Sequence, residues 1–211
     1  MRGAEVLRLR RPDDPAGRNQ AWFGLRHMLA LRLLSASGSG KTALIARTIQ
    51  ALAAKAPSAA LLAAPASDGD GDRIRAAGGA LLALPAGAAL DARSLLAGLR
   101  QAPPPEGSQL FIEGQGDGAE DLGETAKIAL LAVTDGEDRP LKQPDMFRTA
   151  RLMVLTKIDL LPHVDFHAER AIALARNINP RIEVLRLSAR SGAGFGAWLD
   201  WLADQAPSPP A

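Results

Sequence analysis

A glycine-rich segment has the residue types and spacing of a phosphate-binding loop. Residues 35–42 read Ser-Ala-Ser-Gly-Ser-Gly-Lys-Thr and directly follow the apolar run Leu29–Leu34. Glycines let the backbone turn so that its N–H groups converge on an anion, and the dipole of a following helix adds to the attraction. The residues expected to surround the phosphates are Ser37, Gly38, Ser39 and Gly40. We expect Lys41 to reach the β- and γ-phosphates and the Thr42 hydroxyl to ligate Mg²⁺.

Two later segments have the residue types that recognise a guanine base. The residues concerned are Thr156, Lys157, Asp159, Ser188 and Ala189. Thr-Lys-Ile-Asp follows an apolar run, and the Asp159 carboxylate would accept hydrogen bonds from N1 and the exocyclic amine of guanine, a donor pair that adenine lacks. Lys157 is expected to pack its stem over the base. Ser188-Ala189 follows the next apolar run, and a backbone N–H there would meet the guanine oxygen.

Short apolar runs alternate with helical patterns along the chain. The predicted strands are Leu29–Leu34, Ala59–Ala64, Ala80–Leu84, Gln109–Glu113, Ile128–Val133, Leu152–Thr156 and Ile182–Leu187. The predicted helices are Asn19–Leu29, Lys41–Ala54, Arg73–Ala77, Asp91–Arg100, Asp145–Ala150, Phe166–Asn177 and Gly194–Ala203. This alternation indicates an α/β fold of the P-loop NTPase class, with a mostly parallel sheet and helices on both faces. Such sheets bind ligands beyond the carboxyl ends of their strands, where the motifs above all fall.

Length and composition are those of one globular domain. The chain has 211 residues, 47% of them hydrophobic, which is enough to bury a core. We expect a flexible N-terminus over residues 1–14, a single P-loop domain over 15–204 and a disordered, proline-rich tail over 205–211. No apolar run approaches the roughly 20 residues that span a bilayer, and residues 1–14 are charged where a signal peptide is apolar. These features predict a cytoplasmic chain without a membrane partner.

Charge and cysteine content exclude two further classes of function. The formal net charge is +2, and the densest basic cluster, Arg8, Arg10 and Arg11, lies near the N-terminus. Such a cluster is typical of a solvated chain end, so no nucleic-acid partner is expected. The chain has no cysteine, which excludes disulfides and thiolate metal ligands.

The middle of the chain carries a specific resemblance to a known family. Residues 133–147 read Val-Thr-Asp-Gly-Glu-Asp-Arg-Pro-Leu-Lys-Gln-Pro-Asp-Met-Phe, and Thr-Lys-Ile-Asp-Leu-Leu-Pro continues the match at 156–162. Over residues 15–203 the chain resembles the hydrogenase nickel-incorporation GTPases, also called hydrogenase maturation factor B, of the G3E family of P-loop GTPases. The urease accessory GTPase is a close relative, but residues 135–142 favour the hydrogenase branch.

The resemblance implies a function, cofactors and partners. A member of this family binds GTP with Mg²⁺, hydrolyses GTP slowly and assists nickel insertion into a nickel–iron hydrogenase precursor. GTP would order switch segments and favour a homodimer, which hydrolysis would release. The implied protein partners are a nickel metallochaperone and the precursor of the hydrogenase large subunit.

The chain departs from the family at its metal-binding positions. The family holds nickel or zinc at the dimer interface through a Cys-His pair just before Leu-Asp-Ala, and this chain has Ala88 and Ala89 there. Alanine offers no lone pair, so no nickel or zinc ligand is expected at these positions. His163 and His167 are four residues apart, but the turn-like residues between them favour ordinary surface histidines. Nickel would then be carried by the metallochaperone or by ligands outside the family pattern.

The hydrolytic residues also depart from the usual patterns. Ser35 replaces the first glycine of the phosphate-loop motif. The family ends its second strand with Gly-Asp, whose carboxylate lies near Mg²⁺, and this chain has Ala-Ala-Pro at 63–65. Asp70 matches a family aspartate of the first switch segment, and Glu113 ends its strand in a Walker-B-like position. The expected catalytic residues are Lys41, Thr42, Asp70 and Glu113.

Three other interpretations stay open. The missing switch carboxylate and the missing metal ligands are features of a non-catalytic paralogue that binds nucleotide and acts as a scaffold or regulator. The intact residues Lys41, Thr42 and Asp159 favour an active GTPase instead. A urease-accessory-like GTPase is the second alternative. A small-molecule kinase on a P-loop fold is the third, although such a kinase has no need of the Thr-Lys-Ile-Asp motif.

Overall fold

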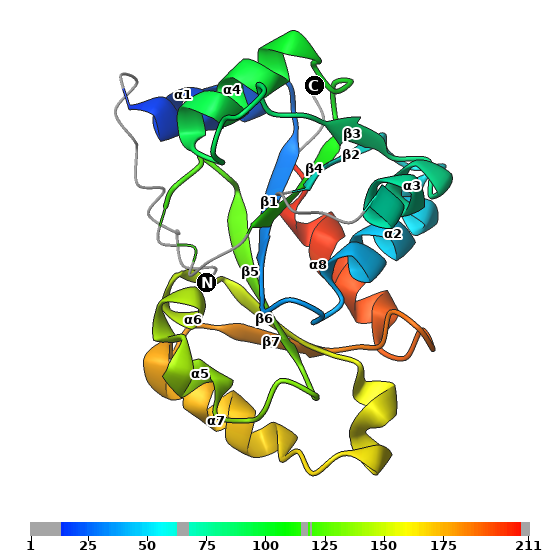
Figure 1. Ribbon diagram of the computed structural model, residues 1–211, viewed down its shortest axis with the longest axis vertical. Coiled ribbons are helices and arrows are strands. Elements are labelled where there is room, and N and C mark those ends of the chain that lie inside the picture. The colour runs from blue at the N-terminus through cyan, green and yellow to red at the C-terminus, as the bar shows by residue number, and fades with distance from the viewer. Residues whose placement is uncertain (1–13, 63–67, 115–117, 119, 208–211) are drawn as a thin grey trace.

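In residues 14–62, 68–114, 118 and 120–207, which the computed structural model describes, a seven-stranded parallel sheet forms the centre of the molecule (Figure 1). The strands are β1 (Leu29–Leu34), β2 (Ser58–Leu62), β3 (Ala80–Leu82), β4 (Gln109–Gly114), β5 (Ala126–Ala132), β6 (Leu152–Thr156) and β7 (Glu183–Arg186). Their order in the sheet is β3-β2-β4-β1-β5-β6-β7, and every neighbouring pair is parallel. Strand β1 therefore lies in the middle, between β4 and β5.

Helices cover both faces of this sheet. The described helices are α1 (Pro15–Leu25), α2 (Lys41–Leu52), α3 (Asp68–Ala76), α4 (Ala92–Gln101), α5 (Arg139–Lys142), α6 (Pro144–Thr149), the 3₁₀ helix η1 (Ile158–His163), α7 (Ala168–Ile178) and α8 (Phe195–Gln205). Helices α2 and α8, with part of α3, pack on one face. On the other face, α1 and α4 cover the end of the sheet that holds β2 and β4, and α6 and α7 cover β5 and β6.

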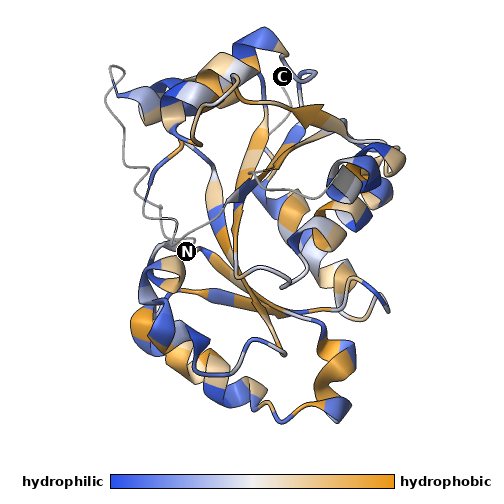
Figure 2. Cartoon of the chain, in the orientation of Figure 1, coloured by the Kyte–Doolittle hydropathy of each residue, from blue (hydrophilic) through white to orange (hydrophobic). Residues whose placement is uncertain are grey.

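Strand β1 shows how the chain fills both faces. Leu29, Leu31 and Leu33 pack with α2 and α8, whereas Ala30 and Leu34 pack with the helices of the opposite face. Because side chains alternate between the two faces of a strand, a largely apolar run, broken here only by the buried Arg32, is the pattern of a strand buried on both sides. Figure 2 shows the resulting apolar band along the strands and the hydrophilic outer sides of the helices.

Helix α2, which follows the phosphate loop, is anchored by both apolar and polar contacts. Leu44, Ile45 and Ile49 are buried in the core beneath it. The buried Thr48 hydroxyl donates to the carbonyl of Leu44 (2.7 Å) and accepts from the indole Nε1 of Trp198 on α8 (2.8 Å). A buried indole N–H without a partner would cost stability, so this bond holds α8 against α2. The phosphate loop therefore leads into a firmly supported helix.

The fold class predicted from the sequence is confirmed, and the seven predicted strands coincide with β1 to β7 apart from their ends. The predicted helix over Asn19–Leu29 needs the largest correction, because α1 begins four residues earlier and ends four residues earlier. Pro15 is suited to the first position of a helix, where its missing N–H costs nothing. His27, with φ 51°, then turns the chain toward β1.

Two further helical segments differ from the predictions. Helix α3 begins at Asp68, not at Arg73, because its first turn is a run of acids and glycines with no apolar periodicity to reveal it. The sequence patterns did not predict α5 or η1. Helix α5 spans four residues and η1 contains Pro162, so neither presents the repeating apolar face on which such predictions rest.

None of the described helices is long and apolar enough to cross a membrane. Residues 1–13 and 208–211, which make up most of the predicted flexible N-terminus and of the predicted tail, lie outside the described residues. The predicted domain boundaries at residues 15 and 204 therefore stay predictions.

Candidate functional site

The loop between β1 and α2 uses two glycines in left-handed conformations. Gly38 has φ 78°, and Gly40, the residue before α2, has φ 93°. Residues with a Cβ rarely adopt such angles. A Cβ at either glycine would meet no atom within 4 Å, so the space beside both residues is open. The loop has the sharp turn and the open side that an anion at a helix N-terminus requires.

Lys41 is buried at the start of α2, and oxygen atoms hold its ammonium group. Its Nζ donates to Ser35 Oγ (2.8 Å) and to the carbonyl of Ala36 (3.2 Å), and it lies 3.7 Å from Glu113 Oε1. Ser35 in turn donates its hydroxyl to the carbonyl of Ala36 (2.7 Å). The serine that replaces the usual first glycine is thus a ligand of the loop lysine. The general phosphate-loop motif does not predict this contact, because it has glycine, which lacks a side chain, at the position of Ser35.

Thr42 and Glu113 complete the phosphate end of the site. The Thr42 hydroxyl donates to Glu113 Oε2 (3.2 Å). Burial raises the pKa of Glu113, and the Lys41 ammonium group and the Thr42 hydrogen bond partly offset the rise. The negative charge of Asp70, on α3, raises this pKa further. Lys41, Thr42 and Glu113 therefore lie in contact, with Asp70 in electrostatic range of them.

The oxygen groups at this end of the site suit Mg²⁺. This hard cation binds hydroxyl and carboxylate oxygens, in most sites one or two carboxylates completed by water and phosphate. Thr42 and Glu113 supply one oxygen of each kind, and a cation beside Glu113 would favour the charged form of a carboxyl group whose pKa burial raises. Residues 63–65, where the family carries a further carboxylate, lie outside the described residues.

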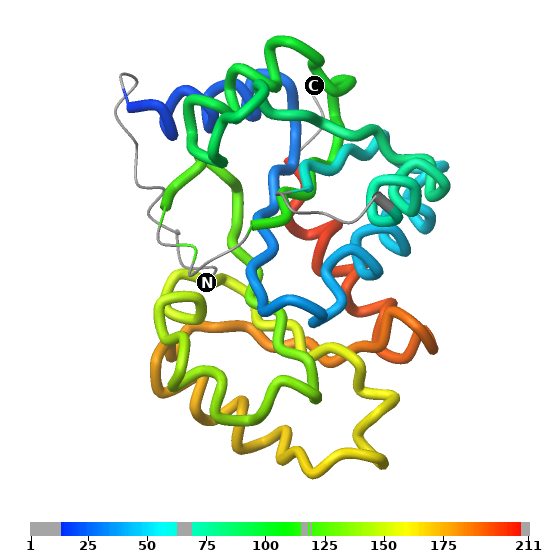
Figure 3. The backbone as a smooth tube through the Cα atoms, in the orientation of Figure 1, coloured from blue at the N-terminus to red at the C-terminus, as the bar shows by residue number. Residues whose placement is uncertain are grey.

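A cavity of about 270 Å³ opens beside the phosphate loop. The predicted nucleotide-binding residues in its lining are Ser39, Gly40, Thr156, Lys157, Asp159, Ser188 and Ala189. These residues lie at or after the ends of β1, β6 and β7, and the colours of Figure 3 show how far apart along the chain those segments are. Ser37 and Gly38 do not line the cavity; they are exposed at the turn of the loop. The structure therefore brings the predicted base-binding residues to one wall, next to the phosphate loop.

Hydrogen bonds tie the base-binding segments to the loop and to one another. Thr156 Oγ1 donates to the carbonyl of Ser39 (2.8 Å) in the protein interior. Lys157 has φ 58°, uncommon for a residue with a side chain, and its Nζ donates to Thr134 Oγ1 (3.5 Å). Backbone strain of this kind gathers at ligand-binding positions. The loop after β7 folds around Ser188, whose Oγ accepts from the backbone N–H groups of residues 190 and 191.

Asp135 belongs to the site although no motif singled it out as a ligand. Its Oδ2 accepts from the Ser39 hydroxyl (2.6 Å) and from the N–H of Ala132 (3.1 Å). Two segments therefore hold Ser39 in place. Its hydroxyl bonds to Asp135 after β5, and its carbonyl accepts from Thr156 at the end of β6. The signal that could have found Asp135 is its place directly after a central strand, at the sheet edge where ligands bind.

Ala88 and Ala89, at the positions where the hydrogenase maturation GTPases hold metal, lie in the loop before α4. Ala88 and Ala89 have no side-chain donor there, and the carbonyl of Ala89 accepts from the Ser94 hydroxyl. In the described part of the chain, no group of three or more histidine, cysteine or acidic side chains is placed to hold a metal ion. His163 ends η1 and His167 precedes α7, so the two do not share a helical face.

Comparison with known proteins finds similar chains over almost the full length of this one. The hydrogenase maturation factor HypB of Azotobacter vinelandii is 47% identical over 199 residues, which cover 92% of this chain and 66% of the relative. HypB of Escherichia coli K12 is 42% identical over 211 residues, which cover 97% of this chain and 73% of the relative. The chain therefore spans about two thirds of the length of these bacterial relatives.

A solved structure shares the fold. HypB from Archaeoglobus fulgidus is 31% identical and superimposes with a TM-score of 0.83, over 92% of this chain and 97% of the archaeal one. No family model matches the chain. The likeness covers nearly the whole archaeal protein, so it includes the sheet whose strand ends form the site.

The raised pKa of Glu113 predicts a pH dependence of stability. The native carboxyl holds its proton more tightly than the unfolded one, so its contribution to stability is full below about pH 4.5 and is lost as pH rises through the native pKa. Glu113→Gln keeps a neutral side chain at every pH. In Mg²⁺-free buffer, the melting temperature of this variant should therefore rise relative to wild type between pH 4.5 and 7.

The exposed Glu106 supplies the control for this measurement. Glu106→Gln should differ from wild type by the same amount at each pH in that range. A pH-independent difference between Glu113→Gln and wild type would contradict the account of Glu113.

Proposed function

Because the chain belongs to the HypB family of hydrogenase maturation factors, we propose that it binds GTP with Mg²⁺, hydrolyses GTP and assists nickel insertion into a nickel–iron hydrogenase precursor. One observation carries the nucleotide part: Asp159 and Ala189 line the same cavity as Gly40 of the phosphate loop. One cavity thus has a carboxylate that could accept from the guanine N–H groups and a backbone N–H that could donate to the guanine oxygen. The phosphate loop lies beside both.

Lys41 would exchange its partners when GTP binds. Its ammonium group contacts Ser35, Ala36 and Glu113 in this structure, and phosphate oxygens would be stronger acceptors. The exchange would leave Thr42 and Glu113 to hold Mg²⁺, which when bound neutralises charge on the phosphates. Lys41 would then stabilise the negative charge that develops on the transferred phosphoryl group. We propose slow turnover, since these groups supply charge and position, not an activated nucleophile.

Selectivity for guanine would come from unpaired polar groups. A base that lacks the N1–H and the exocyclic amine would leave the Asp159 carboxylate without its hydrogen bonds in a partly buried cavity. The cost of such a mismatch is larger than the benefit of the matched pair, so it discriminates strongly.

The nucleotide state would be transmitted through α3. This helix begins at Asp68 and carries Asp70, whose charge acts on Glu113. A γ-phosphate and a cation beside Glu113 would change the electrostatic field at Asp70, so that α3 would sense the nucleotide as the switch segments of other GTPases do. We propose that this state favours a homodimer and that the chain works in the cytoplasm with a nickel metallochaperone and the hydrogenase large-subunit precursor.

Nickel itself would be held by the metallochaperone. The backbone and methyl groups of Ala88 and Ala89 offer no soft or imidazole donor for this ion. In this proposal the chain contributes the GTP-dependent step, and the partner contributes the metal ligands.

A non-catalytic role as a nucleotide-binding scaffold or regulator is the second candidate. It is favoured by Ala-Ala-Pro at 63–65, which removes the family carboxylate near Mg²⁺. The contacts of Glu113 with Thr42 and with Lys41 favour the active GTPase. The two candidates differ in whether bound GTP is hydrolysed. The similarity to hydrogenase maturation factors supports the hydrogenase branch over a urease-accessory role.

Asp159→Asn is expected to change base specificity. The amide cannot accept both guanine N–H groups, so GTP affinity should fall roughly 100-fold, for the loss of about 3 kcal/mol in hydrogen bonds to a charged group. Xanthosine triphosphate, which has an oxygen in place of the amine, should bind better than to wild type. Titration calorimetry with both nucleotides measures this, and Asp165→Asn, at an exposed aspartate, is the control. Unchanged GTP affinity of Asp159→Asn would mean that the base binds elsewhere.

Nickel titration tests the division of labour between chain and partner. The purified chain should bind Ni²⁺ weakly both with and without a non-hydrolysable GTP analogue, because Ala88 and Ala89 supply no ligand. The double substitution Ala88→Cys with Ala89→His restores the family pair and should gain tight, nucleotide-dependent binding. Tight nucleotide-dependent binding by the unaltered chain would contradict the proposal that a partner carries the metal.

A further inference from the structure

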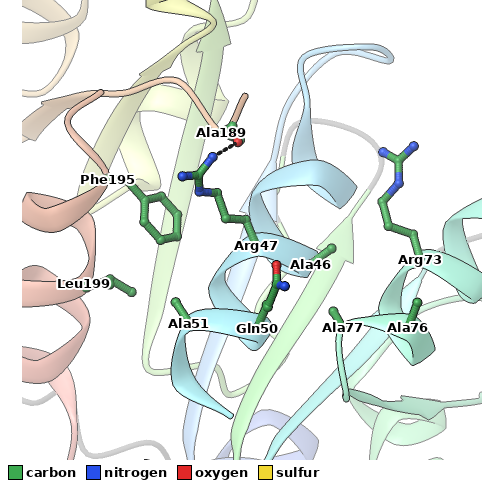
Figure 4. A pocket seen from close by; sticks show the side chains of 10 residues that line it. All are labelled: Ala46, Arg47, Gln50, Ala51, Arg73, Ala76, Ala77, Ala189, Phe195 and Leu199. Carbon is green, nitrogen blue, oxygen red and sulfur yellow. Dashed lines mark hydrogen bonds between the residues drawn. The ribbon is translucent and has the colours of Figure 1, made fainter. Parts of the chain in front are cut away.

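Arg47 connects the helix of the phosphate loop to the loop of the base site. It lies on α2 and lines a groove of about 770 Å³ whose walls come from α2, α3 and α8 (Figure 4). Its Nη1 donates to the carbonyl of Ala189 (2.5 Å) and to the carbonyl of Arg190 (3.1 Å). The guanidinium also lies over the ring of Phe195, 5.0 Å from its centroid. Two carbonyls and one aromatic ring therefore fix the position of the Arg47 guanidinium.

Ala189 forms the wall between this groove and the base cavity, since it lines both. The other backbone N–H groups of its loop have acceptors within the loop: those of Ser188, Arg190, Ser191, Gly192 and Ala193. In residues 188–193, and counting only acceptors that the structure describes, the Ala189 N–H alone has none. A free N–H on a residue that lines the cavity is available to the guanine oxygen.

We infer that Arg47 is a positioning residue for guanine recognition, an inference that rests on the proposed function. By holding the carbonyls of Ala189 and Arg190, Arg47 fixes the two peptide planes that follow the Ala189 N–H. The plane that carries this N–H is held at its own carbonyl, that of Ser188, by the N–H of Gly192, so Ala189 is restrained on both sides. A donor that is oriented before binding loses less entropy when the base arrives. Because Arg47 and Lys41 share α2, the base loop also keeps a constant distance from the phosphate loop.

Residue types at this contact suit the role. A planar guanidinium offers several donors in fixed directions, which matches two neighbouring carbonyls better than an ammonium group does. Gly192, with φ 88°, leaves room for it, since a Cβ there would come within 2.6 Å of Arg47 Nη2. The ring of Phe195 supports the cation from another side.

The test compares GTP with 6-thio-GTP, in which a weakly accepting sulfur replaces the guanine oxygen but the groups that face Asp159 are kept. Arg47→Ala should weaken GTP binding about tenfold and 6-thio-GTP binding by less than threefold, so the preference for GTP should shrink. Arg47→Lys, which keeps a cation and fewer donors, should show an intermediate loss. Arg73→Ala removes the other arginine of the same groove and should leave both affinities within about twofold (Figure 4).

Equal losses for both nucleotides would overturn the inference, because Arg47 would then act on the phosphate loop. Unchanged affinity for both nucleotides in Arg47→Ala would overturn it too. Circular dichroism shows whether Arg47→Ala is folded, and if it is not, the preference measured for Arg47→Lys decides. A wild-type chain that binds no guanine nucleotide would overturn the proposed function, and this inference with it. If only the inference about Arg47 is wrong, the wild-type chain still binds GTP, so the two outcomes can be told apart.

Discussion

The buried charge of Lys41 is the constraint on which the whole site depends. An ammonium group that is 7% exposed is costly unless oxygen atoms surround it, and Ser35, Ala36 and Glu113 supply those oxygens. Nucleotide phosphates would supply stronger ones. The exchange would release Glu113, whose charged form burial disfavours, to a cation held with Thr42. In the proposed function, this one side chain would couple phosphate binding to the carboxylate at the end of β4 that would hold the metal.

The phosphate end and the base end of the site are held at a constant separation by a few bonds between segments far apart in the chain. Ser39 is hydrogen-bonded to Asp135, in the turn after β5, and to Thr156, at the end of β6. Arg47 extends the same support from α2 to the loop after β7. The parallel sheet makes this possible, because it places the carboxyl ends of β1, β5, β6 and β7 side by side. A ligand that bridges both ends would therefore meet a preformed site.

The sequence predicted the central strands well because they are largely apolar runs buried on both faces, as Leu29–Leu34 illustrates. The motifs also named seven residues that line one cavity, since each motif carries its polar groups in adjacent positions. The ends of α1 and the start of α3 could not be read in this way, because Pro15 and the turn at His27 bound α1 and the first turn of α3 has no apolar periodicity. The contacts of Arg47 and Asp135 escaped prediction for another reason. They join residues 142 and 96 positions apart, and no local pattern encodes such a pairing.

The central claim is that a Lys41-centred site hydrolyses GTP, and steady-state GTP turnover tests it most directly. The account predicts slow, Mg²⁺-dependent hydrolysis by the wild-type chain, on the order of 10⁻⁴ to 10⁻² s⁻¹, as in other switches without an activating partner. Lys41→Ala should abolish it together with GTP binding, while Lys55→Ala, at an exposed lysine beyond the end of α2, should not. Tight GTP binding by the wild-type chain without any Mg²⁺-dependent hydrolysis would contradict the claim and favour the non-catalytic scaffold.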